Sequence, residues 1–168
     1  MKPLAGGRRG GWPLVVLAAL LLATAGCAAG MPRPIGSLDQ RLDRLGGGSS
    51  PALAGRWLAL LAERGGRRQV VLVDVERERP LPLSGLNRPD ALPLSVAVDA
   101  NGGRLAVVRQ IGERTELVLY RRSLGTIERI PMRPPAVPRR VSLRADGREL
   151  AVEVSRGGRP QVDLIRLP

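Results

Sequence analysis

An internal repeat constrains the fold of this chain more than any other feature. Ala59, Ala106 and Ala151 mark the same position in three copies, so the period is 47 and then 45 residues. In each copy the alanine lies in a short apolar segment, a glycine-containing pair follows, and a second apolar segment begins ten residues after the alanine. The paired apolar segments are 58–61 with 69–73, 105–108 with 116–120, and 150–153 with 161–165. This density of β-branched residues and glycines predicts strands joined by hairpins.

A period of this length is typical of a four-stranded propeller blade, which must stack on its neighbours to cover its faces. In the second copy we expect strands at 95–98, 104–110, 116–122 and 126–132. The third copy reaches only its third strand. We therefore predict an all-β fold of three antiparallel propeller-like blades, a partial or open propeller, with repeats at about 50–83, 95–132 and 140–168. An open stack, completion by a strand from residues 31–50, a six-bladed homodimer and docking onto a partner's sheet edge all remain open.

The first residues carry an export signal. Lys2, Arg8 and Arg9 precede an apolar run at 14–25 that is shorter than the roughly 20 residues needed to cross a bilayer as a helix. The run ends at Cys27, the chain's only cysteine, in a sequence that resembles a bacterial lipobox. We expect residues 1–26 to be a lipoprotein signal peptide and Cys27 to be lipidated, which predicts a periplasmic, membrane-anchored lipoprotein. A plain signal peptide is the alternative.

We expect residues 27–49 to form a flexible tether before the domain at 50–168. They contain one candidate helix, 37–45, whose Leu38, Leu42 and Leu45 share a face. We expect Ser37 to cap this helix and the glycines at 46–48 to end it. A helix this short is marginal alone in water, so its leucines either dock on the domain or fray.

The composition argues against an enzyme. The chain has no histidine and one cysteine, which excludes Ser-His and Cys-His nucleophile pairs, the usual zinc sites and an internal disulfide. We expect no cofactor and no metal. Asp99 and Asp146 recur at equivalent turns, and we interpret them as turn formers before catalytic candidates.

The charge is strongly positive, with 27 lysines and arginines against 15 acidic residues. In a blade, the hairpins between the second and third strands share one face with the connections between blades, so this face is predicted to be basic. Its hairpin arginines are Arg64, Arg67, Arg68, Arg109, Arg114, Arg156 and Arg159, and its connections add Arg88, Arg133, Arg139 and Arg140. Such a face steers anionic partners, although arginines at hairpin tips can equally serve only to solvate the turns. An envelope address and only two aromatic residues beyond Cys27 argue against nucleic acid.

The repeats resemble a known family. The segment 146–152 (Asp-Gly-Arg-Glu-Leu-Ala-Val), its echo at 101–107 and the strand at 70–75 are similar to TolB-type propeller repeats, over residues 50–168. This resemblance implies a scaffold or translocation-linked role. In that family the propeller binds a peptidoglycan-associated lipoprotein, but no motif here carries that site over. TolB itself has a closed six-bladed propeller and an additional α/β domain, for which this chain has no room.

These observations together predict a non-catalytic envelope lipoprotein whose TolB-like domain binds an envelope protein or an anionic envelope component through its basic face. The alternative is an accessory subunit that completes a propeller, by self-association or with a partner chain, and senses a small anionic ligand.

Overall fold

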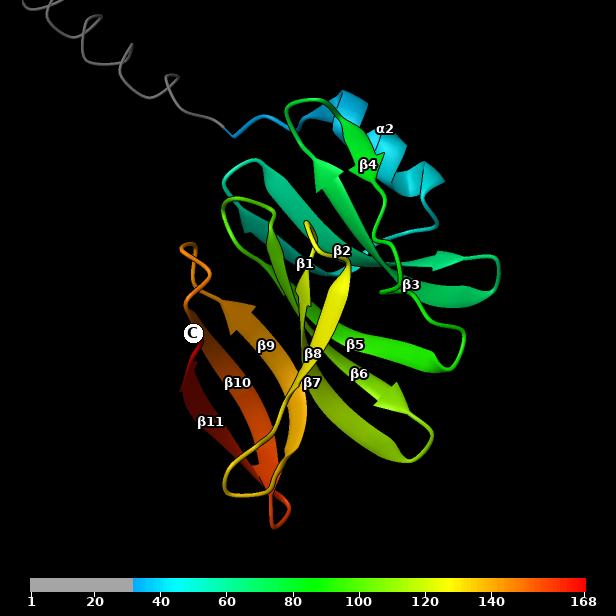
Figure 1. Cartoon of the computed structure of the whole chain (residues 1–168). Coiled ribbons are helices and arrows are strands. Elements are labelled where there is room, and N and C mark those ends of the chain that lie inside the picture. The colour runs from blue at the N-terminus through cyan, green and yellow to red at the C-terminus, as the bar shows by residue number, and fades with distance from the viewer. Residues whose placement is uncertain (1–31) are drawn as a thin grey trace, which may run out of the picture. The chain divides into compact units, whose positions relative to one another are not determined.

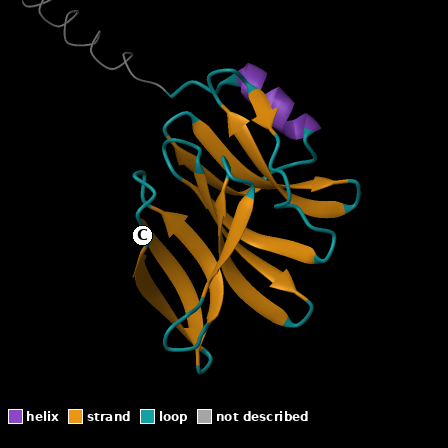
Figure 2. Ribbon diagram, in the orientation of Figure 1, coloured by secondary structure: helices purple, strands orange, loops and turns teal. Residues whose placement is uncertain are grey.

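The computed structural model describes residues 32–168, so Cys27 and the predicted signal segment lie outside the described residues. The described chain consists of one helix, α2, and strands β1 to β11. Figure 2 shows that strands joined by short loops make up nearly all of it. The strands follow from short apolar runs rich in leucine and valine, and the hairpin loops coincide with the glycine-containing pairs.

The strands form three antiparallel sheets, which we call blades 1 to 3 (Figure 1). Blade 1 contains β1 (Ser49–Ala54), β2 (Trp57–Arg64), β3 (Arg67–Asp74) and β4 (Arg79–Leu81). Blade 2 contains β5 (Ala91–Val98), β6 (Arg104–Ile111), β7 (Arg114–Arg121) and β8 (Thr126–Ile130). Blade 3 contains β9 (Val137–Leu143), β10 (Glu149–Arg156) and β11 (Arg159–Arg166). The predicted fold class, three antiparallel blades in an open arrangement, is confirmed.

The strand register shows that the three copies are structurally equivalent. The repeated alanine always lies opposite a leucine of the third strand, as Ala59 with Leu72, Ala106 with Leu119, and Ala151 with Leu164. A backbone hydrogen bond after the third strand also recurs in each blade, at 2.9, 2.8 and 2.7 Å, and it joins Val75 to Arg56, Arg122 to Gly103, and Leu167 to Arg148. The sequence period therefore corresponds to one blade.

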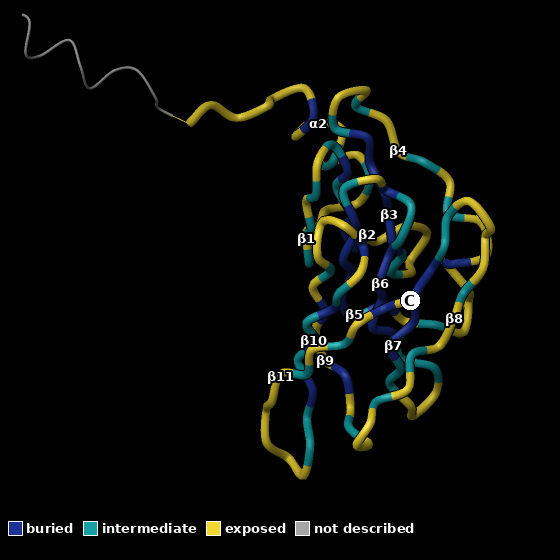
Figure 3. The backbone as a smooth tube through the Cα atoms, turned by 60° about the vertical axis from the view of Figure 1, so that its left-hand side comes forward, coloured by how far each residue is buried: buried dark blue, intermediate teal, exposed yellow. Residues whose placement is uncertain are grey.

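Two apolar layers hold the blades together. The layer between blades 1 and 2 includes Leu61, Leu72, Leu105, Val107 and Tyr120. The layer between blades 2 and 3 includes Val108, Leu117, Leu119, Leu150 and Val152. Adjacent residues of one strand, such as Val107 and Val108, enter different layers because successive side chains point to opposite faces of a sheet. Blade 2 is therefore buried on both faces, as the dark blue middle strands in Figure 3 show.

Helix α2 (Gly36–Arg44) covers the outward face of blade 1. Leu38 is buried there against Leu60 and Val71, and Leu42 and Leu45 pack beside it, so the leucine face docks on the domain. The helix ends where expected, because Gly46 follows it with φ +100°. This docking supplies the burial that a nine-residue helix lacks when it is alone in water.

Two expectations for this segment are wrong. Ser37 does not cap the helix, because Ile35 is the N-cap residue and the Ser37 hydroxyl instead donates a hydrogen bond to Glu78 Oε1 at 2.5 Å. Nor does the segment 31–50 add a strand to blade 3. Residues 36–44 form α2, and Ser49 begins β1, which pairs with β2 in blade 1.

Candidate partner-binding surface

The hairpin between the second and third strands closes with a two-residue turn in every blade. The turns are Gly65-Gly66, Gly112-Glu113 and Gly157-Gly158, and every glycine in them has a positive φ between 56° and 78°. Such turns match the right-handed twist of paired strands. We call these three tips and the connections β4–β5 and β8–β9 the hairpin face. The turns between the first and second strands (55–56, 99–103 and 144–148) make up the opposite turn face, visible at the other strand ends in Figure 1.

Four of the seven predicted hairpin arginines lie exposed at the tips. These are Arg64, Arg67, Arg114 and Arg159, and no hydrogen bond or ion pair to another side chain within residues 32–168 holds them. Of the three arginines expected in the β8–β9 connection, only Arg133 lies there, because Arg139 and Arg140 belong to β9. All three are exposed and have no such pair in the described chain. Their charge is therefore available to a partner.

The other three predicted arginines are paired. Arg68 donates to Glu63 at 3.1 Å, and Arg156 contacts Asp163 at 2.8 Å. Arg109 departs most from the expectation, because its side chain is 8% exposed and pairs with Glu116 at 2.9 Å. The Nη1 atom of Arg109 has no hydrogen-bond partner in the described structure. Arg109 therefore lies under the surface, where it serves the packing of β6 on β7.

A cleft of about 320 Å³ opens on the hairpin face between the β2–β3 hairpin and the β4–β5 connection. Arg67 and Arg68 line its hairpin side, and Arg88 and Asp90 line the side of the connection. The structure thus brings three of the arginines singled out from the sequence into one site. The remaining tips, at Arg114 and Arg159, lie on other blades.

Asn87 shapes this cleft, and sequence reasoning missed it. Its side-chain oxygen accepts a hydrogen bond from the Val70 amide at 2.8 Å, and its amide group donates to the Val70 carbonyl at 2.9 Å. The side chain thus takes over the pairing of β3 beyond the end of the short β4. No local motif distinguishes Asn87 in the sequence, because its partner is 17 residues away.

Ion pairing fixes the charges at the edge of the cleft. Arg88 donates two hydrogen bonds to the carboxylate of Asp90, at 2.9 and 2.7 Å. These hydrogen bonds raise the pKa of the Arg88 guanidinium and lower the pKa of the Asp90 carboxyl. Arg67 has no such acidic partner among the described residues, so the free positive charge of the cleft comes from the hairpin side.

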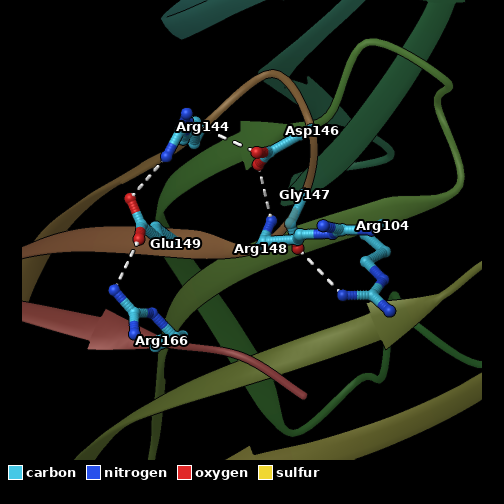
Figure 4. A network of polar contacts seen from close by, with 7 residues as sticks. All are labelled: Arg104, Arg144, Asp146, Gly147, Arg148, Glu149 and Arg166. Atoms are coloured by element: carbon cyan, nitrogen blue, oxygen red, sulfur yellow. Dashed lines mark hydrogen bonds and ion pairs between the residues drawn. The ribbon is translucent and has the colours of Figure 1, made fainter.

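On the turn face most arginines form ion pairs or hydrogen bonds within the structure (Figure 4). Arg144 contacts Asp146 at 3.3 Å and Glu149 at 2.9 Å, and Glu149 also receives Arg166 at 3.3 Å. The hydrogen bond between Arg144 and Glu149 raises the pKa of the arginine and lowers the pKa of the carboxyl. Arg104 donates to the carbonyl of Gly147 at 2.9 Å and so joins blade 2 to blade 3.

Both aspartates that recur at the turns form hydrogen bonds within those turns. Asp99 is buried and accepts from the amides of Gly103 and Arg104 at 2.8 and 3.0 Å. Asp146 accepts from the Arg148 amide at 2.9 Å. They occupy different positions of equivalent turns, because the register places Arg144 where blade 2 has Asp99.

Two further properties belong to the described part of the chain. Its acidic side chains nowhere gather in a group of three that could hold a metal ion. Between residues 32 and 168, no helix has both the length and the apolar character required to span a membrane.

Comparison with known proteins identifies the fold. No family model and no curated protein matches the chain. Among solved structures, TolB from Acinetobacter baumannii matches with a TM-score of 0.55 and 16% identity over 70% of this chain and 29% of TolB. The β-propeller domain of Myceliophteria thermophila Cps50 (Swd1) matches with a TM-score of 0.43 and 18% identity, over 73% of this chain and 39% of that one. The chain thus has a TolB-like, propeller-type fold and spans well under half the length of these structures.

Proposed function

We propose that this chain is a non-catalytic binding module whose hairpin face engages an acidic surface of an envelope protein or another anionic envelope component. The observation that carries the proposal is the unequal use of arginine on the two faces. Arg64, Arg67, Arg114 and Arg159 project from the hairpin tips without an intramolecular side-chain partner among the described residues, whereas most turn-face arginines are ion-paired or bonded to carbonyls. A surface with such an excess of positive charge, which Glu63, Asp90 and Glu113 offset only in part, accelerates and orients association with anions.

The cleft beside Asn87 is the proposed centre of this surface. Arg67 and Arg68 line it on one side, and the Arg88–Asp90 pair lines the other. An acidic side chain entering here meets Arg67 directly and can compete with Glu63 for Arg68. Arginine is suited to this role because its planar guanidinium binds carboxylates through two parallel hydrogen bonds.

A charge-matched pair of triple variants tests this function. One replaces Arg64, Arg67 and Arg114 with Gln on the hairpin face, and the other replaces Arg44, Arg79 and Arg148, which are exposed elsewhere and also unpaired within residues 32–168. We expect the hairpin variant to bind a poly-glutamate peptide about tenfold more weakly at low salt, and the control variant to change affinity less than about twofold. Equal losses in both variants would show that only the total charge matters and would contradict the proposal.

A small anion is the second candidate ligand. The cleft volume of about 320 Å³ is at the lower end of the range for small-molecule sites, about 300–1,000 Å³. Calorimetric titration with pyrophosphate separates the two candidates. Binding that saturates at one site and is lost in Arg67→Gln would favour the small ligand, whereas poly-glutamate binding without pyrophosphate binding would favour the protein partner.

We also propose that the module is tethered to the envelope membrane through Cys27. The support is the lipobox-like sequence at 22–27, which lies outside the described residues. Intact mass and membrane partition of the full-length protein, beside a Cys27→Ala variant, test the anchor. Acylated, membrane-bound wild type and an uncleaved variant are expected, and a soluble wild type with a free thiol would refute the anchor without affecting the binding proposal.

A further inference from the structure

The outer edge of blade 3 can accept a further strand. In blade 2 the equivalent edge is occupied by that blade's own fourth strand, β8. In blade 2, β8 pairs with residues 117–121 of β7. The equivalent residues of blade 3, 45 positions later, are 162–166 of β11. Within residues 32–168 no strand pairs with the outer edge of β11. A sheet edge of this kind presents unpaired amide and carbonyl groups to any complementary strand.

A hollow of about 500 Å³ lies along this edge. Its lining consists of the same five residues, 162–166, together with Pro131 and Arg133 of the β8–β9 connection. The hollow therefore coincides with the positions that hold the fourth strand in blade 2. Two of its residues are strongly exposed apolar side chains, Val162 at 68% and Leu164 at 82%. Figure 3 shows β11 as a largely exposed segment at the margin of the domain, beside β10.

The pairing in blade 2 indicates what such a strand must contain. Glu128 of β8 lies opposite Leu119 and contacts Arg121 at 3.3 Å. Arg166 is the counterpart of Arg121, and its side chain is 85% exposed although it also contacts Glu149. Arg133 adds a second positive charge to the lining. The hollow along β11 therefore favours a strand with an acidic residue opposite Leu164.

The remaining positions complete the pattern. Ile127 and Ile130 of β8 lie opposite Tyr120 and Leu117, so the strand contributes an apolar side chain to each face of the sheet. In blade 3 the matching residues are Ile165 and Val162. Asp163 lies between them and is held by Arg156 at 2.8 Å. A basic or polar residue fits opposite Asp163, as Arg129 lies opposite Val118 in blade 2.

We propose that the outer edge of β11 binds an extended segment of a partner polypeptide, antiparallel to β11, with an acidic residue opposite Leu164 and apolar residues opposite Val162 and Ile165. The strand completes blade 3 by main-chain pairing, while Arg166 and Arg133 select its charge. This site is separate from the arginine-lined cleft, so either proposal can fail without the other.

The test uses a labelled peptide that copies residues 124–132, which contain β8, titrated into the full-length protein. We expect saturable binding at one site per chain. Two further peptides carry N-methyl groups on alternate amides, one on each edge of the strand. One of them must lose binding at least about tenfold because its methyl groups face β11, and the other must retain it, since main-chain pairing uses one edge.

A charge reversal checks the position of the acidic residue. Arg166→Glu should weaken the β8 peptide about fivefold, and a peptide with Lys in place of the glutamate should recover that loss. Arg44→Glu makes the same change of charge on α2, outside both proposed binding sites, and should leave binding unchanged. Circular dichroism of both variants verifies that they are folded, and both substituted residues are exposed.

Several results would overturn the proposal. They are an absence of peptide binding, equal effects of the two N-methylated peptides, and equal losses in Arg166→Glu and Arg44→Glu. A stable dimer that Arg166→Glu dissociates would identify a second copy as the occupant. Binding that appears only when residues outside 35–168 are removed would identify a segment of the same chain.

Discussion

The turn face and the hairpin face are opposite ends of the same strands, yet they use arginine in opposite ways. On the turn face, Arg56 and Arg122 lie over the ring of Trp57, with guanidinium carbons 4.9 and 5.3 Å from its centroid. On the hairpin face, Arg64, Arg67, Arg114 and Arg159 belong to the last residue pair before each turn and make no such contacts among the described residues. Arginines at one end therefore join the blades, whereas those at the tips of the other end have no side-chain partner among the described residues.

The turn face is also where the blades touch through their backbones. The Ala100 amide of blade 2 donates to the Ala145 carbonyl of blade 3 at 2.8 Å, and Gly55 of blade 1 lies close to the Ala100 carbonyl. A turn residue therefore stabilises the stacking of the blades only where it contacts a neighbouring blade. Equivalent substitutions at the two ends should consequently have different costs.

Replacing a turn glycine with alanine should produce the largest difference in the free energy of unfolding between the two faces. A Cβ at Gly102 would lie 2.5 Å from the Trp57 ring, and its φ of +63° is unfavourable for alanine. Gly65 has a similar φ of +58° but no atom within 4 Å of an added Cβ. We expect Gly102→Ala to lower the free energy of unfolding by about 3 kcal/mol and Gly65→Ala by about 1 kcal/mol, measured by urea unfolding. Equal losses would show that backbone conformation alone sets the cost.

The buried ion pair of Arg109 and Glu116 tests whether all hairpin-face arginines lack a stabilising intramolecular partner. Glu116→Ala leaves the buried Arg109 without its carboxylate and should cost about 2 kcal/mol. Glu63→Ala removes the exposed partner of Arg68 and should cost less than about 0.5 kcal/mol. Chemical unfolding of both variants provides the measurement. A small loss in Glu116→Ala would place Arg109 among the free arginines after all.

Asp99 and Asp146 allow a buried and an exposed turn residue of the same face to be compared for their effect on stability. Asp99→Ala removes the acceptor of two amides at a buried site and should cost about 1.5–2 kcal/mol. Asp146→Ala removes one such bond at an exposed site and should cost about 0.5 kcal/mol. Thermal unfolding distinguishes them, and the reverse order would show that the Arg144–Asp146 contact outweighs burial.

Ionisation of Tyr120 at alkaline pH should produce the smallest loss of folding stability. This residue lies in the apolar layer between blades 1 and 2. Its hydroxyl donates to the Ser84 carbonyl at 3.0 Å, and burial raises the pKa of the phenol above its ordinary value. A raised pKa in the folded state means that this stability is fully present below about pH 10 and declines above it, because the unfolded chain ionises first. Urea midpoints at pH 8 and pH 11 should therefore fall more in wild type than in Tyr120→Phe. Parallel declines would assign the pH effect to other groups.

The strand pattern was predictable because it depends on neighbours in sequence. Hairpin tips such as Gly65-Gly66 join strands that pair with each other, so glycine and β-branched residues define them locally. The period placed Ala59, Ala106 and Ala151 at one structural position, and the register confirms it. The docking of Leu38 was one of two outcomes left open, because a short amphipathic helix does not reveal its own partner.

Contacts between distant residues were not predictable. Trp57 contacts Gly102 and the Asn87 side chain binds the backbone of Val70, and neither pair follows from residue type or spacing. Arg109 and Glu116 lie opposite each other in one hairpin, but the burial of Arg109 depends on the tertiary structure. The cleft depends on the β4–β5 connection folding back beside the β2–β3 hairpin. Its three arginines could be named from the sequence, whereas their meeting could not.

The sequence by itself determined that this chain forms three equivalent blades of antiparallel strands with arginine at their hairpin tips, since short apolar strand segments and turn chemistry act over a few residues. Only the tertiary structure decided which arginines remain free, which face of blade 1 the helix covers, and that the edge of β11 lies beside a hollow. Those outcomes depend on how the blades stack, and stacking brings together side chains that are tens of residues apart in the chain.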